Sequence, residues 1–262
     1  MHGEFMKRLC LLGFVSLMSV SAFAQRSLSE VQMDRLPKVV QKMLTSNNID
    51  LDRYSKSREY EANILHYNRH IRQYEINMNP KELFATYANV SPKEAWNSKR
   101  AKLAMGYFDD TETIKYADKD EFGPIQVGDL YFLQLDVHLG KVPVAFEISV
   151  VDHVNRIIRF NYLKQNKSNG LQTLYFMEHE TDPNKTILNH ISYFKSDSRF
   201  RDKNAYIPFH NILIDDFHRN HLERLSTDVK ENDRISVKIL AQEKDFLDKD
   251  IYKEETQLEP AQ

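Results

Sequence analysis

The sequence predicts an α+β fold in which a curved antiparallel β-sheet wraps around one long C-terminal helix, with a helical N-terminal extension. Three observations support this prediction. Five apolar, alternating segments follow one another between residues 130 and 197, with only short turns between them. One long amphipathic segment, residues 208–229, comes directly after them. The helical segments are therefore grouped at the ends and do not alternate with the strands, which favours α+β over α/β.

Residues 1–24 have the features of a secretory signal peptide. Lys7 and Arg8 form a basic start, an apolar run follows, and Ala22-Phe23-Ala24 matches an A-x-A cleavage pattern. We expect a bacterial Sec-type signal, a mature chain that starts at Gln25, and a secreted or periplasmic protein. The apolar run is too short for a comfortable transmembrane span, so no transmembrane segment is expected in the mature chain. An uncleaved N-terminal anchor is the alternative.

Composition excludes several classes of function. Cys10 is the only cysteine and lies in the signal, so the mature chain would have no disulfide, catalytic thiol or cysteine zinc site. The net charge is −2, with both signs interspersed, which is not the footprint of a protein that binds nucleic acid or an anionic membrane. Apolar residues make up 41% of the sequence, enough for a core without disulfides.

Residues 25–70 are predicted to form a helical extension ahead of the main domain. Their apolar residues recur at loose helical spacing, and Pro37 indicates a break or kink. This segment is either a preface to the domain or an arm through which a protein partner binds.

The main domain, residues 71–232, is predicted to begin with a short strand at Ile71. A helix then starts at Asn79-Pro80, and a second helical turn has Ser91 as its N-cap and Pro92 at its first position. Turn residues between 123 and 128 precede the sheet. The five strands are expected at residues 130–139, 142–152, 156–164, 171–181 and 185–197.

The long helix is the only long element left to cover the concave face of such a sheet, and this arrangement is the helix-grip plan. The segments "INMNPKELFATYANVSPKEAW", "QVGDLYFLQL", "VAFEISVVD" and "RFNYLK…NGLQTLYFMEHE" and the last helix resemble the START-like, or Bet v 1-like (SRPBCC), superfamily, and within it a bacterial family of unknown function. The resemblance covers about residues 71–230. It implies a cavity between sheet and helix for a lipid, sterol, polyketide or other apolar molecule, and no catalytic residue. It leaves a charged C-terminal tail, residues 233–262, unexplained.

The faces of the last helix give the candidate binding residues. At about 100° per residue its apolar residues fall within a half-circle, His221 lies near the middle of that arc, and His210 lies beside it. Asp215 and Asp216 point away from it and are expected in solvent. Arg159 stands between apolar residues of a strand, where it would need an acidic partner or an anionic head-group. The expected ligand-binding residues are His210, Leu213, Ile214, Phe217, His221, Leu225 and Arg159.

Two other interpretations of the histidines stay open. His218 and His221 could bind zinc with a third ligand from His138, His179 or His190, but no H-E-x-x-H pattern supports this. His221 could equally be a hydrogen-bonded core residue. No catalytic residue, metal or cofactor is predicted.

Three hypotheses on function follow from the sequence. The first is an exported protein that binds an apolar or amphipathic, lipid-like small molecule without catalysing a reaction. The second is an enzyme on the same scaffold that uses cavity histidines for acid–base chemistry. The third is a periplasmic interaction protein without a ligand.

Overall fold

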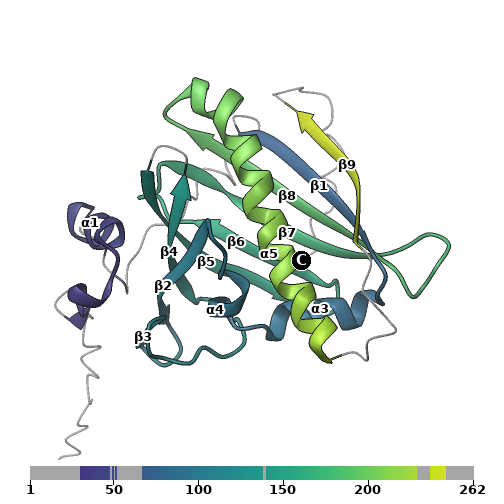
Figure 1. The fold of residues 1–262 in the computed structure, drawn as a ribbon, viewed down its shortest axis with the longest axis horizontal. Coiled ribbons are helices and arrows are strands. Elements are labelled where there is room, and N and C mark those ends of the chain that lie inside the picture. The colour runs from purple at the N-terminus through teal and green to yellow at the C-terminus, as the bar shows by residue number, and fades with distance from the viewer. Residues whose placement is uncertain are drawn as a thin grey trace, which may run out of the picture.

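The computed structural model describes residues 30–47, 49, 51, 67–137, 140–228 and 237–245, and side chains up to residue 223 (Figure 1). The predicted signal peptide and most of the predicted tail lie outside the described residues. Within the described part, no helix combines the length and the apolar character needed to cross a membrane.

In the described part of the chain, the strands form one nine-stranded antiparallel sheet in the order β3-β2-β4-β5-β6-β7-β8-β1-β9. The five consecutive strands β4 to β8 are neighbours in the sheet, which confirms the predicted meander. The strands are β1 (Asn68–Ile76), β2 (Ala101–Phe108), β3 (Thr113–Tyr116), β4 (Leu130–Val137), β5 (Gly140–Asp152), β6 (Ile157–Tyr162), β7 (Ser168–Glu178), β8 (Thr186–Ser196) and β9 (Val237–Asp245).

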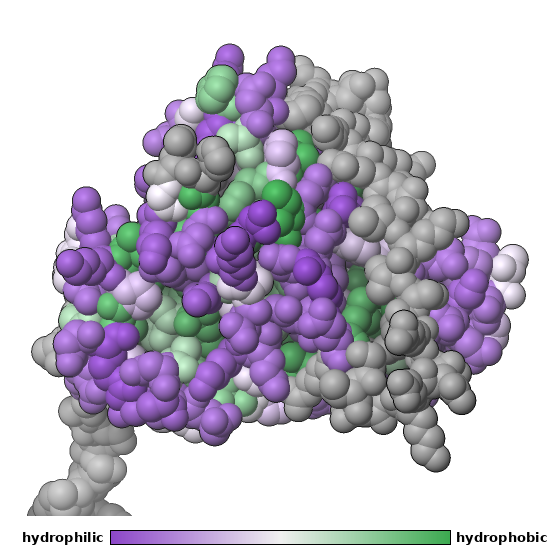
Figure 2. Space-filling model, in the orientation of Figure 1, coloured by the Kyte–Doolittle hydropathy of each residue, from purple (hydrophilic) through white to green (hydrophobic). Residues whose placement is uncertain are grey.

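The long helix α5 (Ile207–Asp228) crosses one face of this sheet, with α3 and α4 near it (Figure 1). The predicted helix-grip fold is therefore confirmed. The other helical elements are η2 (Met33–Arg35), α1 (Lys38–Ser46), α3 (Pro80–Asn89), α4 (Pro92–Ala95) and the π-helical segment η4 (Arg201–Tyr206). The outward surface over α5 is mostly hydrophilic, with small hydrophobic areas between the polar side chains (Figure 2).

The short helices start where their capping residues predict. The Asn79 side chain accepts a hydrogen bond from the backbone N–H of Lys81, and Ser91 accepts one from Lys93. Each cap is followed by proline at the first helical position, where the missing N–H costs nothing. These two caps fix α3 and α4 beside α5, on the face where the cavity lies.

The N-terminal segment packs against the sheet as well. Val40 and Leu44 of α1 are fully buried in a cluster with Met105 of β2 and Phe132 of β4. The next residue of β4, Leu133, belongs to the cluster that contacts α5. Because successive side chains of a strand point to opposite faces, the segment that contains α1 covers the face of β4 that α5 does not.

Four features of the sheet differ from the sequence prediction, and the first is that the short edge strand β3 was not predicted. Strand β2 was not predicted, because it is buried on both faces and does not alternate. Part of the charged tail forms β9, which pairs with β1 from Ile76↔Val237 to Arg69↔Asp245. The fourth of the five strands was expected to begin at residue 171, but β7 already begins at Ser168. Gly170 is needed inside this strand because its φ is +138° and a Cβ there would lie 1.8 Å from the carbonyl oxygen of Tyr193.

Candidate ligand-binding site

A cavity of about 420 Å³ lies between the sheet and the first part of α5. Small-molecule sites in proteins usually have volumes of this order and mostly apolar walls with a few polar groups. The apolar lining residues are Trp96, Leu133, Leu135, Val137, Val142, Pro143, Val144, Phe146, Phe160, Ala205, Phe209, Leu213 and Ile214. The polar ones are Tyr162, Asn166, Lys167, Ser168, Gln172, Arg201, Tyr206 and His210.

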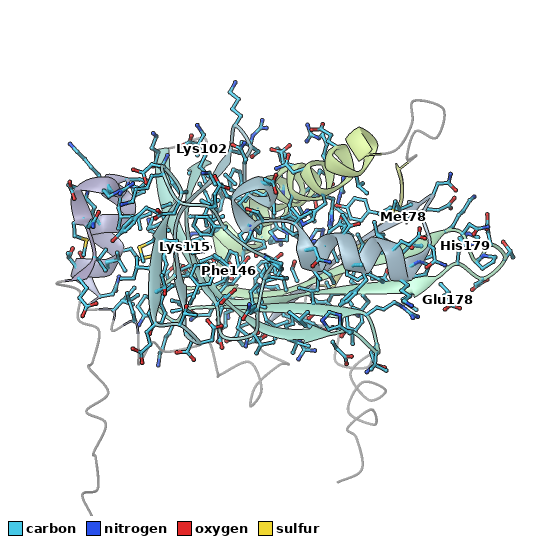
Figure 3. The ribbon with its side chains drawn as sticks, turned by 90° about the horizontal axis from the view of Figure 1, so that it is seen from below. Met78, Lys102, Lys115, Phe146, Glu178 and His179 are labelled. Carbon is cyan, nitrogen blue, oxygen red and sulfur yellow. The ribbon has the colours of Figure 1, made fainter. Side chains whose placement is uncertain are left out.

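Strand alternation brings the apolar walls together. Leu133 and Leu135 of β4 and Val144 and Phe146 of β5 are at alternate positions and all line the cavity. Figure 3 shows Phe146 in the space between the sheet and the helices. The alternation predicted for β5 continues only to Ile148, because a register shift between Ile148 and Val150 interrupts the pairing with β6.

The predicted helix residues divide between two spaces. His210, Leu213 and Ile214 line the cavity. Phe217 and His221, one to two turns further along α5, line a smaller pocket of about 30 Å³. Helical periodicity thus placed them on the buried face, but α5 is long enough for that face to cover two separate spaces. The side chain of Leu225 lies outside the described residues.

Arg159 does not reach the cavity, which corrects the expectation from the sequence. Its neighbour Phe160 lines the cavity, so Arg159 points to the opposite face of β6. There its Nε donates a hydrogen bond to Oγ1 of Thr173, at 3.1 Å. The apolar residues on either side of Arg159 in the sequence did not reveal to which face of the strand its side chain points.

The expectation that Asp215 and Asp216 lie in solvent is also wrong. Asp215 accepts two hydrogen bonds from the Arg72 guanidinium, at 2.7 and 2.6 Å, and a third from the Tyr74 hydroxyl, at 2.8 Å. Asp216 is 8% exposed and pairs with Arg219 on the same helix. Asp215 lies just beyond the apolar arc of α5, and the long side chain of Arg72 on β1 reaches it there. This ion pair fastens α5 to the sheet.

Five histidines are buried between α5 and the sheet, three on α5 and two on the strands: His210, His218, His221, His70 and His190 are each at most 4% exposed. Desolvation, together with the charge of neighbouring histidines, lowers the pKa of His190, His210 and His218 well below the usual value. These three side chains are therefore neutral at pH 7, and each has one ring nitrogen that donates and one that accepts.

The contacts of His221 are those of a core residue. Its Nδ1 lies 2.8 Å from the Phe217 carbonyl oxygen one turn earlier, and its ring stacks on Tyr87 with centroids 4.0 Å apart. The neutral imidazole can satisfy this carbonyl with an N–H. The interpretation of His221 as a hydrogen-bonded residue of the core agrees with this geometry.

The zinc alternative does not fit the described geometry. His190 and His218 bind each other, with Nδ1 of His190 2.9 Å from Nε2 of His218. His179 lies in the loop between β7 and β8 (Figure 3), where its Nε2 is 3.9 Å from Oε2 of Glu75, and His138 is outside the described residues. Within the described part, no group of three or more histidine, cysteine, aspartate or glutamate side chains is placed to hold a metal ion.

Two of the buried histidines, His190 and His218, belong to a continuous series of hydrogen bonds that ends at the cavity wall. In order, its members are Tyr87, His218, His190, Gln172, Tyr162 and Tyr206, here named the Tyr87–Tyr206 network. The sequence analysis did not identify it, although Gln172 within the apolar strand "LQTLYF" is the kind of polar residue that needs a buried partner. Its last three members line the cavity.

Comparison with known proteins gives matches only among solved structures. No protein-family model matches the chain, and no curated protein shows a significant match. A major latex-like protein of Panax ginseng aligns at 12% identity with a TM-score of 0.42, over 60% of this chain and 99% of that one. Norcoclaurine synthase of Thalictrum flavum aligns at 9% identity with a TM-score of 0.43, over 65% and 94%. A Thermus thermophilus protein aligns at 10% identity with a TM-score of 0.43, over 62% and 99%. Similarity this low supports no statement on function, and the fold assignment rests on the topology above.

Proposed function

We propose that this protein is exported and binds an apolar or amphipathic, lipid-like small molecule in the cavity between the sheet and α5. The observation that carries the proposal is the cavity of about 420 Å³ with its largely aliphatic and aromatic walls. Each 100 Å² of apolar ligand surface removed from water there would contribute about 2.5 kcal/mol to binding. A filled core would offer no such gain.

The polar residues of the lining favour an amphipathic ligand over a pure hydrocarbon. Tyr162, Gln172 and Tyr206 form one polar area, and Lys167 and Arg201 form a second. Arg201 is already engaged, since its guanidinium donates to the Lys167 carbonyl oxygen at 3.1 Å and to Asp197 at 2.9 Å. A few polar groups in an apolar wall are the usual means by which a site orients its ligand.

Binding is tested by filling the cavity. The neutral fluorophore N-phenyl-naphthylamine, which brightens in apolar surroundings, should bind the wild-type protein. Leu213→Trp should weaken its binding at least about tenfold, because the indole would occupy the cavity. The matched control is Ile212→Trp on the same helix, whose position is 38% exposed and outside the cavity lining. Equal binding by both variants would contradict the proposal.

Export is supported by the basic start, apolar run and A-x-A triplet within residues 1–24. When the full chain is produced in a bacterium with a Sec pathway, intact mass spectrometry should find a mature protein that begins at Gln25 outside the cytoplasm. Ala24→Tyr should block the processing, since the cleavage site requires small residues. Recovery of unprocessed wild-type protein from the cytoplasm would contradict export and leave the binding proposal intact.

The enzyme alternative has weaker support in the geometry. An acid–base mechanism would use a cavity histidine that a carboxylate orients. His210 lines the cavity, but its hydrogen bond within the described part of the chain is with Ser192, where Nε2 and Oγ are 3.4 Å apart. The binding function therefore remains the proposal.

A further inference from the structure

The distances in the Tyr87–Tyr206 network show that it is connected from end to end. The Tyr87 hydroxyl lies 2.8 Å from Nδ1 of His218, and Nε2 of His218 lies 2.9 Å from Nδ1 of His190. Nε2 of His190 lies 2.5 Å from Oε1 of Gln172. The Gln172 amide nitrogen then donates to the Tyr162 hydroxyl, which lies 3.3 Å from that of Tyr206.

The chemistry of these groups gives the network one direction. Oε1 of Gln172 can only accept, so Nε2 of His190 carries the hydrogen. A neutral imidazole has one N–H, so Nδ1 of His190 accepts from Nε2–H of His218. By the same reasoning Nδ1 of His218 accepts from the hydroxyl of Tyr87. Every bond from Tyr87 to Tyr162 therefore donates toward the cavity.

The opposite direction, with the Gln172 amide flipped, is disfavoured at Tyr87. Both histidines would then donate away from the cavity, and the Tyr87 hydroxyl would have to accept from His218. Tyr87 is 2% exposed, and within the described residues His218 is its only hydrogen-bond partner. Its own hydroxyl hydrogen would thus be buried without an acceptor, at a cost of roughly 1–3 kcal/mol.

This direction determines what the network presents at the cavity. Tyr162 and Tyr206 have two hydroxyl hydrogens, and the single bond between them uses one. The Gln172 amide nitrogen donates to the Tyr162 hydroxyl oxygen, so Gln172 accepts neither of the two phenolic hydrogens. Whichever tyrosine donates to the other, one phenolic O–H remains at the cavity wall without a protein acceptor in the described part of the chain.

We propose that the Tyr87–Tyr206 network holds a phenolic O–H donor at the cavity wall and thereby selects ligands that carry a neutral carbonyl-type acceptor, such as a ketone, ester or amide. This inference rests on the proposed binding function and names the ligand class for the same site. The network is made only of neutral groups, because His190 and His218 are buried and uncharged. It therefore matches a neutral acceptor better than a carboxylate, because the network itself supplies no positive charge to offset the desolvation of a carboxylate.

Three probes separate the contributions of shape, acceptor and donor. Acetylnaphthalene carries a carbonyl, isopropenylnaphthalene has nearly the same shape without it, and carbazole offers only an N–H donor. Each is measured by displacement of N-phenyl-naphthylamine from the wild-type protein and from the double variant Tyr162→Phe, Tyr206→Phe. The double variant is needed because each single variant leaves one hydroxyl that can still donate.

The double variant should weaken acetylnaphthalene binding roughly five- to tenfold and change isopropenylnaphthalene binding less than about twofold. The infrared C=O stretch of bound acetylnaphthalene should lie below its value in hexane in wild type, and return toward that value in the variant. Unchanged isopropenylnaphthalene binding shows that the variant is folded. A matched control, Tyr116→Phe, removes the hydroxyl that accepts from the Gln32 N–H near α1, and should affect no probe.

The outcomes distinguish the inference from the function on which it rests. If none of the probes binds the wild-type protein, the proposed function is contradicted. If all bind and the double variant does not discriminate between ketone and alkene, only the inference is contradicted. If the variant weakens carbazole and not acetylnaphthalene, the network runs in the opposite direction and presents an acceptor.

Discussion

At the scale of single residues, the role of a polar side chain in this protein depends on its partner. Asp215 and Asp216 are adjacent on α5, yet one holds a strand and the other a residue of its own helix. Asp215 bonds Arg72 and Tyr74 of β1, both more than 140 positions away in the sequence. Asp216 pairs with Arg219, three positions along. The dipeptide alone does not distinguish these roles.

Asp215→Ala should lower the free energy of unfolding by about 2 kcal/mol, because it leaves the Arg72 guanidinium, only 10% exposed, without its carboxylate. We take a value below that of a fully buried pair, since the Asp215 side chain is 32% exposed. Urea unfolding measures the change. The matched control is Asp197→Ala, which removes an ion pair with Arg201 at an 82% exposed carboxylate and should cost less than about 0.5 kcal/mol. Equal costs would show that Arg72 finds another partner.

At the scale of elements, pairing between β7 and β8 brings the polar network and the cavity together. Gln172 of β7 is opposite Ser192, and His190 of β8 is opposite Leu174, so Gln172 and His190 are diagonal neighbours on the face toward α5. A shift of one residue between the two strands would turn one of these two side chains to the other face of the sheet and separate it from its partner. The close approach of the two backbones at Gly170, which is opposite Phe194, fixes this register.

Gly170→Ala should destabilise the protein by roughly 3 kcal/mol or more, because the added Cβ would collide with backbone at a positive φ. The collision would be with the Tyr193 carbonyl oxygen, at 1.8 Å. Gly123→Ala is the control, since a Cβ there meets nothing within 4 Å, and we expect a change within about 0.5 kcal/mol. Thermal and denaturant unfolding of both variants measure these changes in stability. A Gly170→Ala protein as stable as the control would rule out the tight approach.

At the scale of the whole molecule, buried ionisable groups make folding depend on pH. His190, His210 and His218 have lowered pKa values in the folded state, so the unfolded chain binds more protons than the folded one below about pH 6.5. Asp129 acts in the opposite sense, because burial raises its pKa to about 6 and the folded state keeps a proton that the unfolded carboxyl loses. On unfolding, the three histidines take up more protons than Asp129 releases, so acid destabilises the folded state.

The free energy of unfolding should therefore fall as pH decreases below about 6.5, with a slope set by the excess of protons that the unfolded chain binds at these four groups. Urea unfolding across the pH range gives this slope. His218→Gln should reduce it by about one proton, or about 1.4 kcal/mol per pH unit. His153→Gln, at an exposed position, is the matched control. If the His218→Gln variant kept the slope of the wild-type protein, His218 would bind a proton equally in the folded and the unfolded protein.

Much of the fold is encoded locally and was predictable. Alternation identified the five strands from β4 to β8, and helical spacing placed the last helix at residues 208–229, against Ile207–Asp228 in the structure. Capping residues fixed the starts of α3 and α4. Strand β2 was missed because burial on both faces removes the alternation, and β9 because its sequence is as charged as a solvated tail.

The sequence by itself determined the five strands β4 to β8, the long helix and the apolar face that this helix buries, since hydrophobic periodicity records the face that an element turns to the core. It placed His210, Leu213 and Ile214 on the helix face that lines the cavity. Only the tertiary structure decided which polar groups meet there, that Asp215 binds Arg72, that Arg159 points away, and that Tyr87 connects to Tyr206. The reason is physical: a hydrogen bond requires two atoms within about 3 Å. Between residues on distant strands and helices, that distance is set by register and packing, which no local pattern contains.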